Sequence, residues 1–262
     1  MQRIVVLNPK GGSGKTTIAS NLAACYAAGG ERPVLMDLDP QASSMRWLRR
    51  RPDDVAPIHG IATFERSTTV TRSWQLRIPA DCRTVIVDTP AAIEPHTLPD
   101  LTRGADAVIV PVMPSDIDIH ATAKCIADLL LVAKIRRSER RIGILANRVR
   151  SNTRVSQSLT RFLSSLDIPL IATLRDTQNY VRSAETGIGV CEMPRWQVQH
   201  DLPQWQQLLS WLAARRRPSV AKPTVTTDPN GVERSGVQAE PPKVPSLAQL
   251  SSQADRELDA SA

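Results

Sequence analysis

Short apolar runs alternate with longer stretches of helical periodicity along most of the chain. The runs are rich in Val, Ile and Leu, which predicts buried strands at residues 4–8, 33–37, 84–88, 107–111, 142–147 and 169–173. Runs that are apolar on both faces and separated by helices are typical of parallel sheets covered on both sides. We therefore expect a doubly wound α/β fold, with a mostly parallel sheet and helices on both faces.

Three segments carry the spacing of a helix. Residues 16–28 are rich in Ala and end before a pair of glycines, which is a common helix C-terminus. Residues 119–134 form an apolar stripe made of Ala123, Ile126, Ala127, Leu130 and Leu131. A last stripe favours a final helix packed on the core, and consists of Trp205, Leu208, Leu209 and Leu212. Residues 49–79 are the hardest part of the domain to interpret, because Thr, Arg and aliphatic residues alternate there.

Composition divides the chain at residue 217. Residues 1–217 predict one globular domain, whereas residues 218–262 are rich in Pro, Ser and Val, contain no aromatic residue and predict a disordered tail. The tail carries four basic and six acidic residues, so the net charge of +7 for the 262-residue chain leaves +9 on the domain. A basic domain indicates an anionic partner beyond a nucleotide, and nucleic acid and anionic lipid both fit.

Hydropathy and cysteine spacing indicate the compartment. The apolar run at the amino terminus is too short for a signal peptide, and no stretch is long enough to span a bilayer, so we expect a cytoplasmic protein. The cysteines form no Cys-x-x-C pair and have no His at metal-ligand spacing. We therefore expect core thiols at Cys25, Cys82, Cys125 and Cys191.

A glycine-rich loop, residues 10–16, joins the first predicted strand to the first predicted helix. Its glycines let backbone N–H groups curl around phosphates, and the helix N-terminus adds a positive end. Lys15 can reach the outer phosphates and the Thr16 hydroxyl can bind Mg²⁺, so the loop predicts a site for ATP and Mg²⁺. The cofactor-binding residues predicted here are Lys10, Gly11, Gly12, Ser13, Gly14, Lys15, Thr16 and Thr17.

Three acidic residues follow predicted strands, at the edge where open α/β sheets bind their ligands. Asp37 and Asp39 come directly after the second strand, in the sequence Asp-Leu-Asp-Pro-Gln. On this pattern alone they serve equally well as turn and cap residues. Asp88 ends a strand of the buried type, which is how a carboxylate is positioned next to Mg²⁺-bound water.

The loop departs from the ordinary phosphate-binding pattern, because Pro9 replaces a glycine and Lys10 adds a second lysine. The sequence Lys-Gly-Gly-Ser-Gly-Lys-Thr-Thr resembles the deviant Walker A motif of the ParA/MinD family of ATPases, closest to short ParA-type proteins. The similarity covers residues 2–212, and residues 114–118 also resemble the Pro-Ser-x-x-Asp segment of those proteins. The resemblance implies that Lys10 reaches across a dimer to the partner's phosphates, the alternative being a merely solvated lysine.

The same resemblance implies roles for other residues. Asp39 would orient the attacking water, which makes Lys10, Lys15 and Asp39 the predicted catalytic residues. Thr16, Asp37 and Asp88 are the predicted Mg²⁺ ligands. Asn147 would bind the adenine edge, although a turn-forming Asn is the alternative. Asn-Lys-x-Asp does not occur in the chain, which argues against a guanine-specific site.

For function, the resemblance implies an ATP-driven positioning cycle. ATP would close a homodimer that binds DNA non-specifically, and a ParB-like adaptor protein would stimulate hydrolysis and release. The cargo would be a plasmid, a chromosome region or a large cytoplasmic assembly, and the protein would be cytoplasmic and nucleoid-associated. Arginines suit phosphate contacts without base recognition. The candidates are Arg148, Arg150, Arg154, Arg175, Arg182, Arg195 and Arg215 to Arg217.

Two other functions remain open at this point. The last apolar stripe, followed by three arginines, could lie on anionic lipid, as in a MinD-like membrane organiser, although core packing is favoured. A metabolic ligase or amidase of the same superclass has no substrate-binding signature here. No helix-turn-helix pattern precedes the loop, so operator binding is not expected. In the tail, one face of a short helix could dock a partner, and this face would comprise Leu247, Leu250 and Leu258. A passive linker is the favoured alternative.

Two related classes are excluded by residue type. Relatives of the nitrogenase iron protein need a cysteine after the strand that ends at Asp88, but Ala91 and Ala92 stand there. Bacterial tyrosine kinases of this class carry a tyrosine cluster near the C-terminus. The present chain has only Tyr26 and Tyr180.

Overall fold

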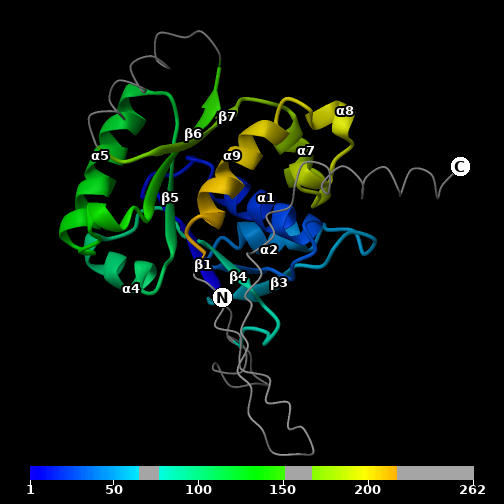
Figure 1. Cartoon of the computed structure of the whole chain (residues 1–262), viewed down its shortest axis with the longest axis horizontal. Coiled ribbons are helices and arrows are strands. Elements are labelled where there is room, and N and C mark those ends of the chain that lie inside the picture. Colours follow the sequence, from blue (N-terminus) through cyan, green and yellow to red (C-terminus); the bar gives the residue numbers. More distant parts are fainter. Residues whose placement is uncertain (65–76, 151–166, 217–262) are drawn as a thin grey trace, which may run out of the picture.

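A computed structural model of the chain describes residues 1–64, 77–150 and 167–216 (Figure 1). One seven-stranded sheet runs through it in the order β3-β2-β4-β1-β5-β6-β7, and all the pairings in this part of the chain are parallel. The strands are β1 (Gln2–Val6), β2 (Val34–Asp37), β3 (His59–Ala62), β4 (Thr84–Asp88), β5 (Ala107–Val112), β6 (Ile142–Val149) and β7 (Leu170–Arg175). The predicted doubly wound α/β class is confirmed.

Helices cover both faces of the sheet. Figure 1 shows α4 and α5 on one side and α1, α7, α8 and α9 on the other. The α-helices are α1 (Lys15–Ala28), α2 (Ser43–Leu48), α4 (Leu98–Thr102), α5 (Asp116–Leu131), α7 (Asn179–Thr186), α8 (Arg195–Val198) and α9 (Leu202–Ala213). Single 3-10 turns are η1 (Pro95–Thr97), η2 (Arg137–Glu139) and η3 (Val190–Glu192).

The strands are apolar on both sides because each side faces its own core. In β1, Ile4 and Val6 pack with α1 and α9, whereas Val5 and the following Leu7 pack with α5. All four side chains are fully buried. This alternation explains why the strands appear in the sequence as continuous apolar runs.

One strand lies where no element was predicted, and one local prediction was wrong. The strand β3 falls within residues 49–79; it was not predicted because this edge strand contains His59 and Gly60 and two of its four residues are exposed. In α5 the predicted stripe has the wrong phase. Ile126 is buried as expected, but Leu131 is 76% exposed and Leu129 is completely buried. A run of three leucines at the end of α5 hides which of them faces the core.

The predicted packing of the final helix is confirmed. In α9 the side chains of Trp205, Leu208, Leu209 and Leu212 are all buried in the core shared with α1. Within the described ranges, no helix combines the length and the apolar character needed to cross a bilayer. The predicted tail, residues 218–262, lies outside the described residues, so its candidate leucines stay predictions.

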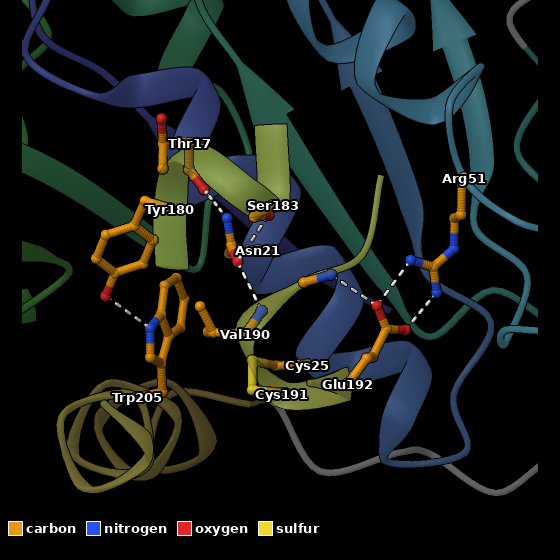
Figure 2. The surroundings of a disulfide bond; sticks show 11 residues. Thr17, Asn21, Cys25, Arg51, Tyr180, Ser183, Val190, Cys191, Glu192 and Trp205 are labelled. Carbon is orange, nitrogen blue, oxygen red and sulfur yellow. Dashed lines mark hydrogen bonds and ion pairs between the residues drawn. A yellow bond between two sulfur atoms is a disulfide. The ribbon is translucent and has the colours of Figure 1, made fainter. Parts of the chain in front are cut away.

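The expectation of four core thiols was wrong for one pair. The sulfur atoms of Cys25, in α1, and Cys191, in η3, form a disulfide across a separation of 166 residues (Figure 2). The remaining pair, Cys82 and Cys125, are free and buried as expected. Sequence spacing could not reveal the disulfide, because packing of η3 against α1 brings the two residues together.

Candidate functional site

The glycine-rich loop connects β1 to α1 at the carboxyl edge of the sheet. Gly12 and Gly14 have φ values of 76° and 93°, a left-handed backbone that residues with a Cβ rarely adopt. The first turn of α1 has neither a side-chain cap nor an acidic residue. Its first N–H groups therefore lack side-chain acceptors and lie at the positive end of the helix dipole, an arrangement that suits a phosphate group.

Lys15 is the first residue of α1, and its side chain folds back over the loop. Its ammonium donates a hydrogen bond of 3.1 Å to the carbonyl oxygen of Lys10. Burial lowers the pKa of Lys15, whereas the charges of Asp88 and Asp39 act in the opposite direction. The cation is therefore close to two of the predicted site carboxylates and inside the loop predicted to hold phosphates.

Asp88 lies at the end of β4, beside the start of α1. Its Oδ2 accepts hydrogen bonds from the Thr16 hydroxyl at 2.8 Å and the Ser44 hydroxyl at 2.7 Å. Its Oδ1 is buried and has no hydrogen-bond partner among the described residues. Burial raises the pKa of Asp88 to about 6, although the two hydroxyl hydrogen bonds lower it.

These groups fit a magnesium ion. Two hydroxyls and a carboxylate form the hard, oxygen-only donor set that Mg²⁺ prefers, and one buried carboxylate oxygen is free to take a ligand. A bound cation would also offset the cost of burying the charged carboxylate. Thr16 and Asp88 were predicted from the sequence as Mg²⁺ ligands, and this role stays a prediction. Ser44 was not among the predicted residues, because it carries no motif and reaches Asp88 only since α2 begins beside Asp37.

Asp37 lies directly across from Asp88 in the parallel pairing of β2 and β4. Its carboxylate accepts the backbone N–H of Asp39 at 2.9 Å, and those of Ser44 and Met45 at 3.0 and 3.2 Å. Burial raises its pKa, while these three hydrogen bonds lower it. Asp37 therefore holds the start of α2, and its place in the Mg²⁺ shell stays a prediction.

Asp39 is more accessible than Asp37. It is half-buried, and its Oδ1 accepts the backbone N–H of Gln41 at 2.9 Å, which is a turn contact. No hydrogen bond or ion pair involves its Oδ2 within the described ranges, so this oxygen can contact a water molecule. Its charge also opposes the lowering of the Lys15 pKa that burial causes.

Lys10 is held by its own chain. Its ammonium forms an ion pair of 2.7 Å with Asp118, whose side chain is 6% exposed while that of Lys10 is 33% exposed. Ser115 caps α5 by accepting the backbone N–H of Asp118 at 3.2 Å, and its hydroxyl also bonds the Asp118 carboxylate. The Pro-Ser-x-x-Asp segment therefore anchors the second lysine. Asp118 was not among the predicted site residues, although its motif had been noted.

Asn147 contacts the loop from the end region of β6. Its Nδ2 donates to the Ser13 carbonyl at 2.9 Å, and its Oδ1 accepts the backbone N–H of Arg148 at 3.0 Å. A Cβ at Gly14 would lie 2.1 Å from the same Nδ2, so no side chain fits there. Asn147 thus supports the loop, and adenine binding by this residue stays a prediction.

The predicted DNA-contacting arginines differ in their exposure and in their partners. Arg175 pairs with the buried Asp201, and Arg216 forms two hydrogen bonds with Glu31 at 2.6 and 2.9 Å, so both have structural partners. The exposed members are Arg148, Arg150, Arg182 and Arg195. Arg154 and Arg217 lie outside the described residues.

A protein-family model matches most of the domain. It is described as the CobQ/CobB/MinD/ParA nucleotide binding domain and matches residues 4–190, which is more than half of the chain. All the predicted site residues, from Lys10 to Asn147, fall within this range. The matched range therefore includes the whole predicted site.

Two curated relatives have names that describe distribution or partitioning. Maintenance of carboxysome distribution protein A from Gloeobacter kilaueensis is 38% identical over 116 residues, which is 44% of this chain and 51% of that protein. The chromosome-partitioning ATPase Soj of Thermus thermophilus is 30% identical over 185 residues, which is 61% of this chain and 74% of that protein. The chain thus spans about half the length of the first relative.

A solved structure shares the fold. A plasmid partition protein from Borrelia burgdorferi B31, bound to AMPPNP, superposes with a TM-score of 0.60 and 15% sequence identity. The match covers 82% of this chain and 99% of that one. At this level of identity the likeness concerns the fold alone.

Proposed function

Because the chain belongs to the CobQ/CobB/MinD/ParA nucleotide-binding family, we propose that it is an ATP-hydrolysing switch that positions a plasmid, a chromosome region or a large cytoplasmic assembly. One observation carries the proposal. The loop contains two lysines with different surroundings: Lys15 lies inside the loop, while Lys10 points out of it to Asp118. The named tasks of the carboxysome-distribution and chromosome-partitioning relatives support the same class of function.

The residues around the loop divide the work of binding. The N–H groups of the first turn of α1 receive the phosphates, and Lys15 exchanges its contact with the Lys10 carbonyl for a phosphate oxygen. Thr16 and Asp88 would hold Mg²⁺, which neutralises charge on the phosphates when bound. Asp37 keeps α2 in place, so that Ser44 stays within reach of Asp88.

Asp39 is the group suited to orient the attacking water. Its free Oδ2 can accept a hydrogen bond from water, and its charge interacts with that of Lys15 in the loop. Asp88 is less suited to this task, because its Oδ2 already accepts two hydroxyl hydrogen bonds.

Lys10 supplies the second cation. To reach a phosphate in a partner subunit, its ammonium must leave Asp118. A phosphate group carries more charge than a carboxylate, so a closely apposed ATP-bound partner can draw the lysine away. This exchange would couple ATP binding to formation of a homodimer.

Non-specific DNA is the proposed surface on which the dimer assembles, which would make the protein cytoplasmic and nucleoid-associated. The net charge of +9 on residues 1–217 supports an anionic partner. The exposed Arg148, Arg182 and Arg195 are available for phosphate contacts. A ParB-like adaptor would then stimulate hydrolysis.

The structure removes the basis of the MinD-like membrane alternative, which was the apolar stripe of the final helix. Its apolar stripe is buried in the core of the domain and is not available to lipid. No observation favours the ligase or amidase alternative.

Paired variants test the catalytic assignments. Asp39→Ala should bind ATP, lose turnover and accumulate as a dimer, whereas Lys10→Ala should bind ATP but neither dimerise nor hydrolyse it. Mass measurement in solution with ATP and Mg²⁺, together with phosphate release, separates the two results. Arg103→Gln, an exposed position away from the loop, is the matched control. Normal turnover in Asp39→Ala, or normal dimerisation in Lys10→Ala, would contradict the assigned role.

DNA binding has its own test. Co-sedimentation of the Asp39→Ala dimer with duplex DNA should depend on ATP and weaken by roughly a hundredfold or more between about 50 and 200 mM salt. Vesicles of anionic lipid form the parallel arm. Binding to vesicles but not to DNA would overturn the nucleoid proposal in favour of a membrane organiser.

A further inference from the structure

A hollow with five arginines among its eleven described lining residues lies at the amino edge of the sheet, far from the loop. Its volume is about 580 Å³, and its wall includes Ile142, where β6 begins, and Pro169, which precedes β7. Since the sheet is parallel and the glycine-rich loop follows the carboxyl end of β1, the two places lie at opposite edges. The arginines of this arginine hollow are Arg136, Arg137, Arg140, Arg141 and Arg215.

The positive charge of the arginine hollow is only partly neutralised. Glu139 forms an ion pair with Arg141, which also donates to the Ala105 carbonyl at 2.8 Å. Asp167 is the one carboxylate among the described residues of the lining. Among the described residues, Arg136, Arg137, Arg140 and Arg215 have no ion pair. The hollow therefore has an excess of cations that an anion would balance.

Arg215 is fixed by contacts that use no acidic group. Its guanidinium lies 3.7 Å from the centre of the Trp211 ring, and it donates to the carbonyls of Arg140 at 2.7 Å and Trp211 at 2.8 Å. Burial lowers the pKa of Arg215, and the charge of Arg140 lowers it further. Two like charges are thus held together by packing and backbone contacts, which is unfavourable without a counter-ion.

We propose that the arginine hollow is a second anion site, separate from the nucleotide site, and that it binds a compact ligand carrying two or more phosphate groups. Guanidinium groups match phosphate oxygens in charge and in the geometry of paired hydrogen bonds. The volume lies in the range of pockets for small molecules. With Arg215 already over the Trp211 ring, that ring face is not free to stack on a base.

A compact phosphate ligand fits better than duplex DNA. A duplex presents its phosphates along a wide, convex surface, whereas these arginines line a concave hollow. An inorganic polyphosphate and a nucleoside polyphosphate share the required chemistry.

Inorganic tripolyphosphate is the first probe. Isothermal titration into the unaltered 262-residue chain is compared with titration into two variants. Lys15→Gln disables the phosphate loop, and Arg137→Gln/Arg140→Gln alters two exposed arginines of the hollow. Binding should persist in Lys15→Gln and weaken by about tenfold or more in the double variant. Arg32→Gln/Arg103→Gln removes the same charge elsewhere and should bind as the wild type does. Circular dichroism checks that each chain is folded.

Two further arms distinguish the ligand. A nucleoside tetraphosphate titrated into Lys15→Gln shows whether a base adds affinity beyond that of the phosphates. Whether or not it does, the proposal requires that Arg137→Gln/Arg140→Gln lose binding of the nucleoside tetraphosphate. Tripolyphosphate binding that disappears in Lys15→Gln and persists in Arg137→Gln/Arg140→Gln would overturn the proposal. So would a double variant that loses duplex DNA binding alone, which would make the hollow a nucleic-acid surface.

Discussion

The two halves of α1 are held in opposite ways. At the amino end, Lys15 and Thr16 turn toward the loop and Asp88, and no side chain caps the helix. Farther along, Asn21 accepts hydrogen bonds from the Ser183 hydroxyl at 3.2 Å and the Val190 N–H at 2.9 Å (Figure 2). One turn later, a disulfide joins α1 to η3. The helix is thus open at one end and anchored at the other.

This difference separates support from chemistry. At the open end, Lys15 and Thr16 can exchange their present hydrogen-bond partners for phosphate and Mg²⁺. These partners are the Lys10 carbonyl and the Asp88 carboxylate. Groups in the anchored half are buried among fixed partners, and the Asn21 side chain also donates to the Thr17 carbonyl at 2.8 Å. Changes in the anchored half should therefore alter stability, and changes at the open end should alter turnover.

The largest effect is expected from breaking the disulfide. Reduction of the bond between Cys25 and Cys191 should lower the free energy of unfolding by about 4 kcal/mol, since the bond closes a long loop of the unfolded chain. Urea unfolding with and without dithiothreitol measures this, and ATP turnover of the folded protein should not change. In Cys191→Ala the reductant should have no effect on unfolding. If reduction lowered turnover without unfolding the protein, the anchored half of α1 would affect catalysis as well as stability, which contradicts the proposed separation.

At the open end, the contribution of Asp88 to the free energy of unfolding should depend on pH. The pKa of Asp88 is raised from 3.8 to about 6, so between these values the folded chain holds a proton that the unfolded chain releases. The free energy of unfolding should therefore fall as pH rises through this window. Asp88→Asn lacks this penalty and should match the wild type near pH 4 but exceed its stability by roughly 2 kcal/mol at pH 8.

Turnover should change in the other direction. Asp88→Asn should lower ATP turnover by about a hundredfold, because the carboxylate predicted to hold Mg²⁺ is gone. Urea unfolding across the pH range and phosphate release at pH 8 test the two halves of this expectation. A variant less stable than the wild type at pH 8 would show that Asp88 is mainly structural.

A smaller effect is expected at Asn21. Asn21→Ala leaves the Ser183 hydroxyl and the Val190 N–H without their acceptor, and should cost about 1 to 3 kcal/mol of unfolding free energy with unchanged turnover. Ser20→Ala is the matched control, since that hydroxyl bonds only to carbonyls of its own helix. Equal losses in the two variants would remove the case for an anchor at Asn21.

Local chemistry made much of the fold and the site predictable. Continuous apolar runs identify a strand that is buried on both faces, and the phosphate loop identifies its own strand and helix. Asp88 was found because it ends such a run. In each case the signal lies within a few neighbouring residues.

Features formed by distant segments could not be predicted in this way. Ser44 reaches Asp88 only through the pairing of β2 with β4, and Cys25 meets Cys191 only through the packing of η3. The arginines of the hollow come from η2, its flanks and the segment that follows α9. Strand β3 was missed because an exposed edge needs no apolar run.

The ion pair between Lys10 and Asp118 bears on how reversible any assembly would be. A lysine that already has a carboxylate partner gains, on meeting a phosphate, only the difference between two attractions. When the phosphate leaves, Lys10 can pair again with Asp118, which lies in the same chain at the first turn of α5. A subunit with this ion pair would bind its partner subunit weakly and dissociate from it quickly. Fast dissociation would suit the proposed function, in which the protein must release what it has moved.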